Sequence, residues 1–234
     1  MTAPKDIRIR AVACDIDGTL TDVDTRRLHL GAVRALRELT VPVVLVTGNV
    51  PCVALTYTRA IGTIGLCVAE NGGVVTGDFA GKEHVLADKE MLRPSMDALR
   101  ERFDVHLLND QYRKSEFAMR RDYNLEEGRA CLQSRGFDAK TLVDSGYALH
   151  LKSPNVDKGT GLLMASRLLG IPAREFAAIG DGQTDVELFR EVRIAVAVAN
   201  AAPQLRDAAH FVSESPAGEG AAEALRYLQA TYLE

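Results

Sequence analysis

The chain has 234 residues, of which 47% are hydrophobic and 26% are charged, and its formal net charge at pH 7 is -4. These values are typical of a globular protein and give no bulk positive charge for binding nucleic acid. No stretch approaches the ~18 apolar residues of a membrane helix, so we expect no membrane partner.

The first predicted element is a β-strand at residues 9–14, directly followed by the sequence Asp15-Ile16-Asp17-Gly18. In open α/β sheets, ligands bind beyond the carboxyl ends of the strands, so both carboxylates would project into a binding crevice. A carboxylate can attack phosphorus, and a second one nearby can transfer the proton of the leaving group. Asp15 fits the first role and Asp17 the second. The segment alone also fits a strand followed by an ordinary Asp-Gly turn.

The second predicted strand, at 41–46, is followed by Thr47-Gly48-Asn49. Its β-branched residues fit a buried parallel strand. We expect this loop to bind substrate, with the Thr47 hydroxyl and the Gly48 amide holding a phosphoryl oxygen and Asn49 beside them. Taken alone, the three residues also fit a helix cap or a turn.

The pattern of the core continues along the chain, with predicted strands near 66–69, 176–179 and 194–198 and predicted helices near 31–39, 52–61, 158–169 and 218–230. This alternation predicts an α/β fold with a doubly wound, parallel, Rossmann-like sheet. Glu70-Asn71-Gly72-Gly73 follows the third strand, and both a structural turn and a substrate contact fit this segment.

Between 78 and 152 the order of elements changes to a helix, two strands, a helix and two strands. The helices are expected near 88–103 and 125–135, and the strands near 104–108, 115–120, 141–144 and 147–151. We therefore predict a separate α+β domain at 78–152, inserted into a core domain formed by 1–77 and 153–234.

A polar, basic loop at 109–114 joins the first two predicted strands of the insertion. Arg113 is its best candidate for binding substrate, because a guanidinium can hold a small carboxylate through two hydrogen bonds. The alternative is that Arg113 and its basic neighbours are solvated surface charges.

Lys158 falls in the first turn of the helix predicted at 158–169. A positive charge there opposes the helix dipole, so it is unfavourable unless an anion lies close by. We expect Lys158 to neutralise phosphoryl oxygens and the charge of Asp15. An ordinary solvated lysine is the alternative.

The strand predicted at 176–179 is followed by Asp181, and Asp185 comes four residues later, at the start of another helix. Carboxylate oxygens suit Mg²⁺, which needs only one or two protein carboxylates besides a phosphate. Asp181 is the first candidate ligand. Asp185 could bind directly or through a metal-bound water, or could simply complement the helix dipole.

Taken in order, these four segments resemble the haloacid dehalogenase superfamily, whose phosphatases use D-x-D-G-T, a Ser or Thr, a Lys and a terminal acidic pair. A narrower resemblance to the archaeal-type phosphoglycolate phosphatases spans essentially the whole chain. Thr47 stands where serine is expected, and Thr184 where asparagine commonly precedes the last acid. The first difference keeps the hydroxyl. The second difference leaves open whether the loop near the metal forms the hydrogen bond that an asparagine would make.

The resemblance implies a magnesium-dependent phosphomonoesterase whose C2-type cap covers the site and selects the substrate. Its metal ligands would be Asp15, Asp17, Asp181 and Asp185, and its substrate a small phosphorylated acid, with 2-phosphoglycolate first. The alternatives are a sugar-phosphate phosphatase or phosphomutase of the same superfamily and, from another class, a receiver-like module that stores phosphate. We expect a monomer or a homodimer.

The location of the protein in the cell follows from two further features. The start, MTAPKD, lacks the hydrophobic region of a signal peptide, and the four cysteines form no C-x-x-C pair. Both features favour a cytoplasmic protein with reduced thiols and without a zinc site.

Overall fold

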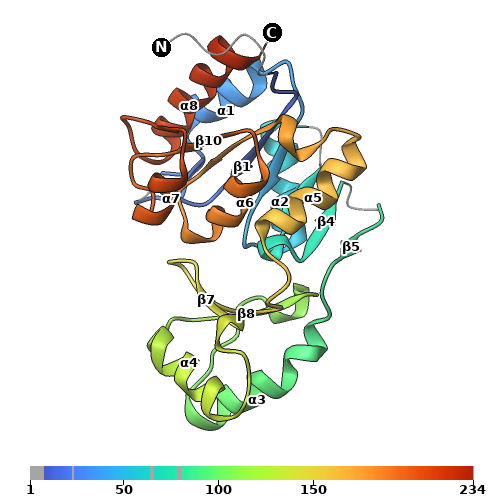
Figure 1. Cartoon of the computed structure of the whole chain (residues 1–234), viewed down its shortest axis with the longest axis vertical. Coiled ribbons are helices and arrows are strands. Elements are labelled where there is room, and N and C mark those ends of the chain that lie inside the picture. The colour runs from blue at the N-terminus through green and yellow to red at the C-terminus, as the bar shows by residue number, and fades with distance from the viewer. Residues whose placement is uncertain (1–7, 23, 64–65, 78–80, 234) are drawn as a thin grey trace.

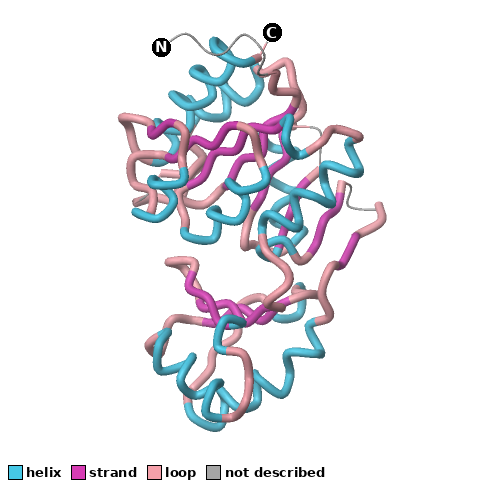
Figure 2. The backbone as a smooth tube through the Cα atoms, viewed as in Figure 1, coloured by secondary structure: helices cyan, strands magenta, loops and turns pink. Residues whose placement is uncertain are grey.

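The computed structural model describes residues 8–22, 24–63, 66–77 and 81–233. Figure 1 shows a larger part that contains β1 and α8 and a smaller part at the other end of the molecule, and Figure 2 shows that each has its own sheet. The larger sheet has the strand order β11-β10-β9-β1-β2-β3-β4-β5. Its strands are β1 (Ala11–Asp15), β2 (Val43–Val46), β3 (Cys67–Ala69), β4 (Val74–Thr76), β5 (His84–Val85), β9 (Phe176–Gly180), β10 (Ile194–Ala197) and β11 (Phe211–Val212).

The six strands from β11 to β3 are parallel, which confirms the predicted doubly wound core. β4 and β5 add an antiparallel edge. The central strands are apolar throughout because helices cover both of their faces. In β1, Val12 and Cys14 belong to one hydrophobic cluster, and Ala11 and Ala13 belong to the other.

The helices of the larger part divide between these two faces. α1 (Leu30–Glu38), α2 (Pro51–Ile61) and α8 (Ala217–Tyr232) contribute to the first cluster, and α5 (Lys158–Leu169), α6 (Val186–Glu191) and α7 (Pro203–Ala208) to the second. The predicted core helices are therefore present. Among the described residues, no helix is long and apolar enough to cross a membrane.

The smaller part is a three-stranded antiparallel sheet with the order β6-β8-β7, covered by two helices on one face. Its elements are α3 (Arg93–Arg102), β6 (Glu116–Met119), α4 (Leu125–Ser134), β7 (Leu142–Asp144) and β8 (Leu149–Lys152). Phe117, Met119 and Leu151 pack against the helices. Figure 1 shows the helices on the side away from the larger part, so the opposite face of the sheet, with Glu116 and His150, lies toward it.

Three expectations about the insertion need correction. The strand predicted at 104–108 forms only an isolated bridge between Leu107 and Met119, because Asn109 takes a left-handed backbone with φ 54° and turns the chain away from β6. The helix predicted from 88 begins as a 3₁₀ turn and becomes α-helical at Arg93, just before a proline that suits a first helical turn. β5 follows the predicted boundary at 78 and yet pairs with β4 in the larger sheet.

The turn at 70–73 joins the two parts. The Glu70 carboxylate accepts hydrogen bonds from the backbone N–H groups of Lys114 (3.0 Å) and Ser115 (2.8 Å), and from the Ser115 hydroxyl (2.7 Å). Gly72 has φ 102°, and a Cβ there would lie 1.8 Å from the Asp157 carbonyl oxygen. Only glycine fits this contact, so the turn has a structural role at the junction.

Candidate active site

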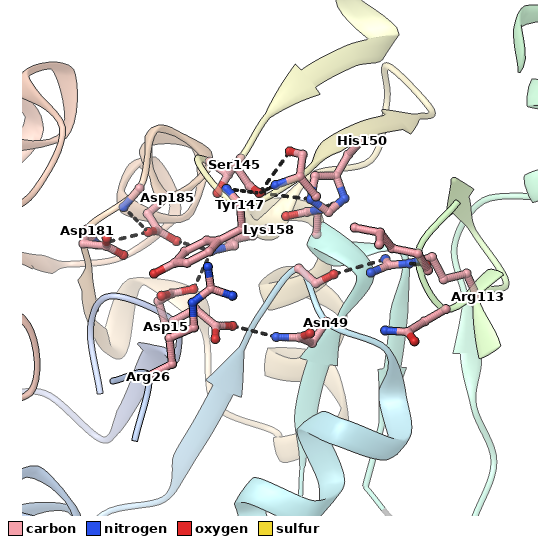
Figure 3. A pocket seen from close by; sticks show the side chains of 18 residues that line it. Asp15, Arg26, Asn49, Arg113, Ser145, Tyr147, His150, Lys158, Asp181 and Asp185 are labelled. Carbon is pink, nitrogen blue, oxygen red and sulfur yellow. Dashed lines mark hydrogen bonds and ion pairs between the residues drawn. The ribbon is translucent and has the colours of Figure 1, made fainter. Parts of the chain in front are cut away.

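A cavity of about 210 Å³ lies between the carboxyl ends of the core strands and the smaller sheet (Figure 3). All the predicted site residues except Thr47 line it, together with Arg26 and Asn71 from the larger part and Ser145, Tyr147 and His150 from the smaller part. Pockets for drug-sized ligands measure ~300–1,000 Å³, so this cavity favours a ligand of few heavy atoms.

Asp15, Lys158 and Asp185 form a buried charged group at the base of the cavity. The Lys158 Nζ donates to Asp15 Oδ1 and to Asp185 Oδ1, both at 2.6 Å, and all three side chains are at most 6% exposed. Burial alone would lower the pKa of Lys158, but the charges of Asp15 and Asp185 raise it well above its ordinary value. Lys158 is therefore a charged residue within the site, and the solvated alternative is wrong.

Lys158 reaches this position because α5 begins at it. The preceding Asp157 caps the helix, accepting from the Thr160 backbone N–H at 2.8 Å, while the Thr160 hydroxyl accepts from the Asp157 N–H at 2.9 Å. This capping box supplies the negative charge that a helix N-terminus favours. The start of the helix and the position of its lysine are thus fixed together.

Three carboxylates crowd together where a cation could bind. Asp15, Asp181 and Asp185 each offer an oxygen, and these oxygens all lie within 4.8 Å of one another. Burial, and next the charge of Asp185, raise the pKa of Asp181 to about 7. A set of oxygen ligands with excess negative charge fits a hard divalent cation.

The loop after β9 holds two of these carboxylates. Asp185 Oδ2 accepts from the backbone N–H groups of Gly182 (2.9 Å) and Asp181 (3.2 Å). From the other side, the Thr19 hydroxyl donates to Asp181 Oδ1 at 3.1 Å, and Asn200 Nδ2 lies 3.5 Å from Asp181 Oδ2. Sequence reasoning missed Asn200, which follows β10 and carries no motif.

Gly18 allows the first loop to approach the acidic group. Its φ is 83°, and a Cβ on it would lie 2.3 Å from Asp181 Oδ2. A side chain at this position would therefore displace the Asp181 carboxylate as well as strain the backbone. The glycine of the Asp-Gly turn thus brings the ends of β1 and β9 together.

Asp17 lies outside this acidic group and has partners of its own. Its Oδ2 accepts from Asn49 Nδ2 at 2.6 Å and from the Thr47 hydroxyl at 3.4 Å. Burial raises the pKa of Asp17 above its ordinary value, against the opposing charge of Lys158. A raised pKa suits a proton donor, whereas the position offers no support for the carboxylate as a metal ligand.

Thr47 does not face the cavity as expected. Its side chain is fully buried, and its hydroxyl bonds to Asp17 and accepts from the Asn49 backbone N–H at 3.0 Å. The next residue, Gly48, does line the cavity. In this arrangement Thr47 and Asn49 orient Asp17.

Arg113 lines the cavity, but its guanidinium is already engaged. Its Nη1 contacts Glu116 and donates to the Gly48 carbonyl oxygen at 3.1 Å, and its Nε donates to the Leu108 carbonyl at 3.2 Å. Burial would raise the pKa of Glu116, but the charges of His150 and Arg113 outweigh it and lower the pKa. Arg113 therefore forms a buried ion pair that joins the two parts, so neither a solvated charge nor a free carboxylate-binding group describes it.

The polar and aromatic wall residues Arg26, Ser145, Tyr147 and His150 were not expected from the sequence. The Arg26 guanidinium lies 4.5 Å from the centre of the Tyr147 ring. His150 Nδ1 lies 2.8 Å from Glu116 Oε1, and its Nε2 lies 3.1 Å from the Ser145 hydroxyl. These residues come from separate loops and a cap strand, and only folding brings them together.

Comparison with known proteins gives a consistent result across the chain. The family of haloacid dehalogenase-like hydrolases matches residues 12–116 and 125–225. A phosphoglycolate phosphatase of Methanosarcina acetivorans is 41% identical over 223 residues, which cover 95% of this chain and 98% of that protein. One from Archaeoglobus fulgidus is 43% identical over 219 residues, or 94% and 96% of the two chains.

Solved structures show the same fold over nearly the whole chain. The crystal structure of Thermoplasma acidophilum 0175 aligns with a TM-score of 0.83 and 26% identity, covering 95% of this chain and 99% of that one. A subclass IIB sugar phosphatase of the haloacid dehalogenase superfamily aligns with a TM-score of 0.77 and 19% identity, covering 94% and 98%. The second likeness, at this identity, concerns the fold alone.

Proposed function

Because the chain belongs to the haloacid dehalogenase-like hydrolases, we propose that it is a magnesium-dependent phosphomonoesterase that hydrolyses 2-phosphoglycolate to glycolate and phosphate. The observation that carries the proposal is the Asp15 carboxylate, held at the base of a small cavity by Lys158 and neighboured by the acidic group. The names of the archaeal relatives support the choice of substrate.

In the proposed reaction, an Asp15 oxygen attacks phosphorus and the ester P–O bond breaks. Asp17 gives its proton to the departing alkoxide, leaving an aspartyl-phosphate. Asp17 then takes a proton from a water that attacks this phosphorus, which releases phosphate and restores the Asp15 carboxylate. Lys158 offsets the negative charge of the phosphoryl oxygens during both steps.

Asp15, Asp181 and Asp185 would hold the magnesium ion, since their oxygens already lie together. When bound, the ion supplies positive charge that stabilises the phosphoryl oxygens. The protein's own contribution is to fix these carboxylates through Thr19, Gly182 and Lys158.

We further propose that the smaller part acts as a cap that closes over the substrate. Tyr147 and His150 from this part line the same cavity as Asp15, which supports the division into a core and an inserted cap. Asp17 beside Asp15 speaks against a phosphate-storing module, because an acid placed to activate water shortens the life of an aspartyl-phosphate.

The test is phosphate release from a panel of esters by the purified chain with Mg²⁺. We expect kcat/KM for 2-phosphoglycolate to exceed that for hexose phosphates by at least about 10-fold, which corresponds to ~1.4 kcal/mol of transition-state discrimination. A preference for sugar phosphates would overturn the substrate. Conversion of a sugar phosphate to its isomer without free phosphate would indicate a mutase, and stoichiometric phosphorylation without turnover a receiver.

Replacing Asp17 tests its role in proton transfer. Asp17→Asn should lower kcat by roughly 100- to 10,000-fold for alkyl phosphates, whose leaving groups need a proton. The loss should be much smaller for p-nitrophenyl phosphate, whose leaving group is stable without one. Single-turnover rates with both substrates provide the measurement, and equal losses would contradict the assignment.

The acidic group should make the effect of metal depend on pH. A carboxyl pKa of about 7 in the folded state lies above that of the unfolded chain, so Asp181 lowers the stability of the metal-free protein as pH rises toward about 7. Mg²⁺ should reverse this loss, because it competes with protons for the carboxylates. We expect the melting temperature gained on adding Mg²⁺ to be larger at about pH 8 than at about pH 5.5.

Calorimetry in chelator and in Mg²⁺ at both pH values checks this prediction. Asp181→Asn is the control, since it should remove part of the pH dependence and reduce the affinity for Mg²⁺. A gain on Mg²⁺ binding that is the same at both pH values would show that the ion binds elsewhere.

A further inference from the structure

Three cationic side chains line the cavity, and two of them are neutralised by carboxylates. Lys158 contacts Asp15 and Asp185, and Arg113 contacts Glu116. Among the residues that the structure describes, Arg26 has neither an ion pair nor a side-chain hydrogen bond. Its guanidinium stacks on the face of the Tyr147 ring. Arg26 is solvent-exposed and lines the cavity, where it presents a cation without an ion-pair partner.

The chain holds Arg26 close to the reacting carboxylates. It lies in a tight turn between two paired residues, Thr21 and Leu28, and its backbone N–H donates to the Asp22 carbonyl at 2.9 Å. Arg26 has φ 53°, which is an unusual backbone conformation for a residue with a side chain. Burial raises the pKa of Asp17, and Arg26 is among the charges that oppose the rise, so the guanidinium lies within electrostatic reach of Asp17.

Tyr147 meets Arg26 from the cap. Figure 3 shows their side chains next to each other near Asp15, although they come from the two different parts. The ring belongs to the loop between β7 and β8, where the Ser145 hydroxyl donates to the Ala148 carbonyl at 3.2 Å and contacts His150. Because His150 is itself buried against Glu116, this loop has a fixed base.

We propose that Arg26 binds the carboxylate of the substrate and that Tyr147 holds its guanidinium in position over the cavity. This inference rests on the proposed function and identifies the group that selects the acid. A guanidinium can stack through its flat face while its edge donates two parallel hydrogen bonds to a carboxylate, so both contacts can exist together. The small cavity requires the carboxylate to lie close to the phosphoryl group.

The same contact explains how the substrate would hold the cap closed. Arg26 belongs to the core and Tyr147 to the cap, so ordering the guanidinium against a substrate carboxylate also orders the ring that covers it. A phosphate ester without a carboxylate lacks this link. The enzyme would then select acids in two ways, through closure of the cap and through the charge of Arg26.

The test compares 2-phosphoglycolate with 2-hydroxyethyl phosphate, which has nearly the same size and no carboxylate. Arg26→Gln should lower kcat/KM for 2-phosphoglycolate by roughly 10- to 100-fold and change the other substrate by less than about 3-fold. Arg26→Lys should fall between Arg26→Gln and wild type, because an amine cannot form the paired hydrogen bonds. Arg27→Gln, on the neighbouring residue of the same turn that does not line the cavity, is the matched control and should leave both substrates near wild type.

Three further variants separate substrate binding from structure. Tyr147→Phe should retain the preference for the acid, whereas Tyr147→Leu should reduce it by roughly 3- to 10-fold through the loss of stacking. Arg113→Gln should lower turnover of both substrates equally, because it removes the guanidinium that pairs with the buried Glu116 and leaves that carboxylate only His150 and Asn71. Equal losses on both substrates for Arg26→Gln, or no loss on either, would overturn the proposal.

The outcomes also distinguish this inference from the proposed function. If wild type hydrolyses 2-phosphoglycolate well and Arg26→Gln keeps the preference for the acid, only the inference fails. If wild type does not hydrolyse 2-phosphoglycolate, the proposed substrate fails. A second pair of substrates, 3-phosphoglycerate and glycerol 3-phosphate, then tests the inference. It requires that Arg26→Gln lower kcat/KM for 3-phosphoglycerate, which has a carboxylate, and leave kcat/KM for glycerol 3-phosphate unchanged.

Discussion

Asp15→Asn should abolish turnover of every phosphate ester, lowering kcat by about 10,000-fold or more, because the amide keeps the shape of the side chain and loses the attacking oxygen. The fold should survive. Lys158 keeps Asp185 as a charged partner, and burial together with the charges of Asp185 and Asp181 already raises the pKa of Asp15 well above its ordinary value. Removing one of three crowded carboxylates therefore should not lower the melting temperature of the metal-free protein.

Phosphate release and calorimetry measure these two effects, and Asp97→Asn, on an exposed residue of α3, is the matched control. Rapid acid quenching with labelled substrate should trap phosphate on the wild-type chain and none on the variant. Mass spectrometry checks that the amide has not hydrolysed back to the acid. Substantial residual turnover in a preparation that passes this check would contradict a nucleophilic Asp15.

The residues at the strand ends could be predicted because their position follows from local sequence. A buried apolar strand that ends in polar residues delivers them to the same edge of a parallel sheet, whatever the rest of the chain does. Asp15, Asp17 and Asp181 lie there. Lys158 could be placed for a related reason, since the start of a helix is marked by Asp157 and the apolar periodicity that follows.

The direction in which a side chain points within a loop could not be predicted in the same way. Thr47 follows its strand as expected, and its hydroxyl donates to Asp17, a contact that the sequence did not predict. Arg113 was predicted to be available to a substrate because the loop around it is polar. Its partner Glu116 is only three residues away, but the pair becomes buried only when the cap packs on Gly48.

Contacts between distant loops leave no signal in the sequence. Arg26 lies in a hairpin after β1 and Tyr147 in a turn of the cap, and each alone looks like a surface residue. The predicted strand at 104–108 failed for a similar reason, because the left-handed turn at Asn109 limits its pairing with β6 to one bridge. Alternation of apolar residues predicts an extended segment, but whether it pairs depends on where the next turn leads.

Lys158→Met should cause the largest combined loss of stability and activity of any single substitution in the site. The thioether has a similar length and no charge, so Asp15 and Asp185 would remain buried without a cation. Breaking a buried ion pair in this way typically costs about 3–5 kcal/mol of unfolding free energy. Loss of the charge that faces the phosphoryl oxygens should lower kcat by about 100- to 1,000-fold.

The pH dependence separates this effect from a simple packing defect. Without Lys158, the pKa of Asp15 should rise further, because the lysine charge that lowers it is gone, so the folded variant binds protons more tightly than the unfolded chain does. The destabilisation relative to wild type should therefore be small at about pH 5 and grow toward about pH 8. Mg²⁺ should restore part of the stability by replacing the missing charge, without restoring kcat.

Denaturant unfolding in chelator and in Mg²⁺ provides the measurement, with Lys140→Met on the exposed cap surface as the control. A destabilisation that is equal at both pH values would show that Lys158 contributes packing alone, and near-normal kcat would remove it from the phosphoryl site.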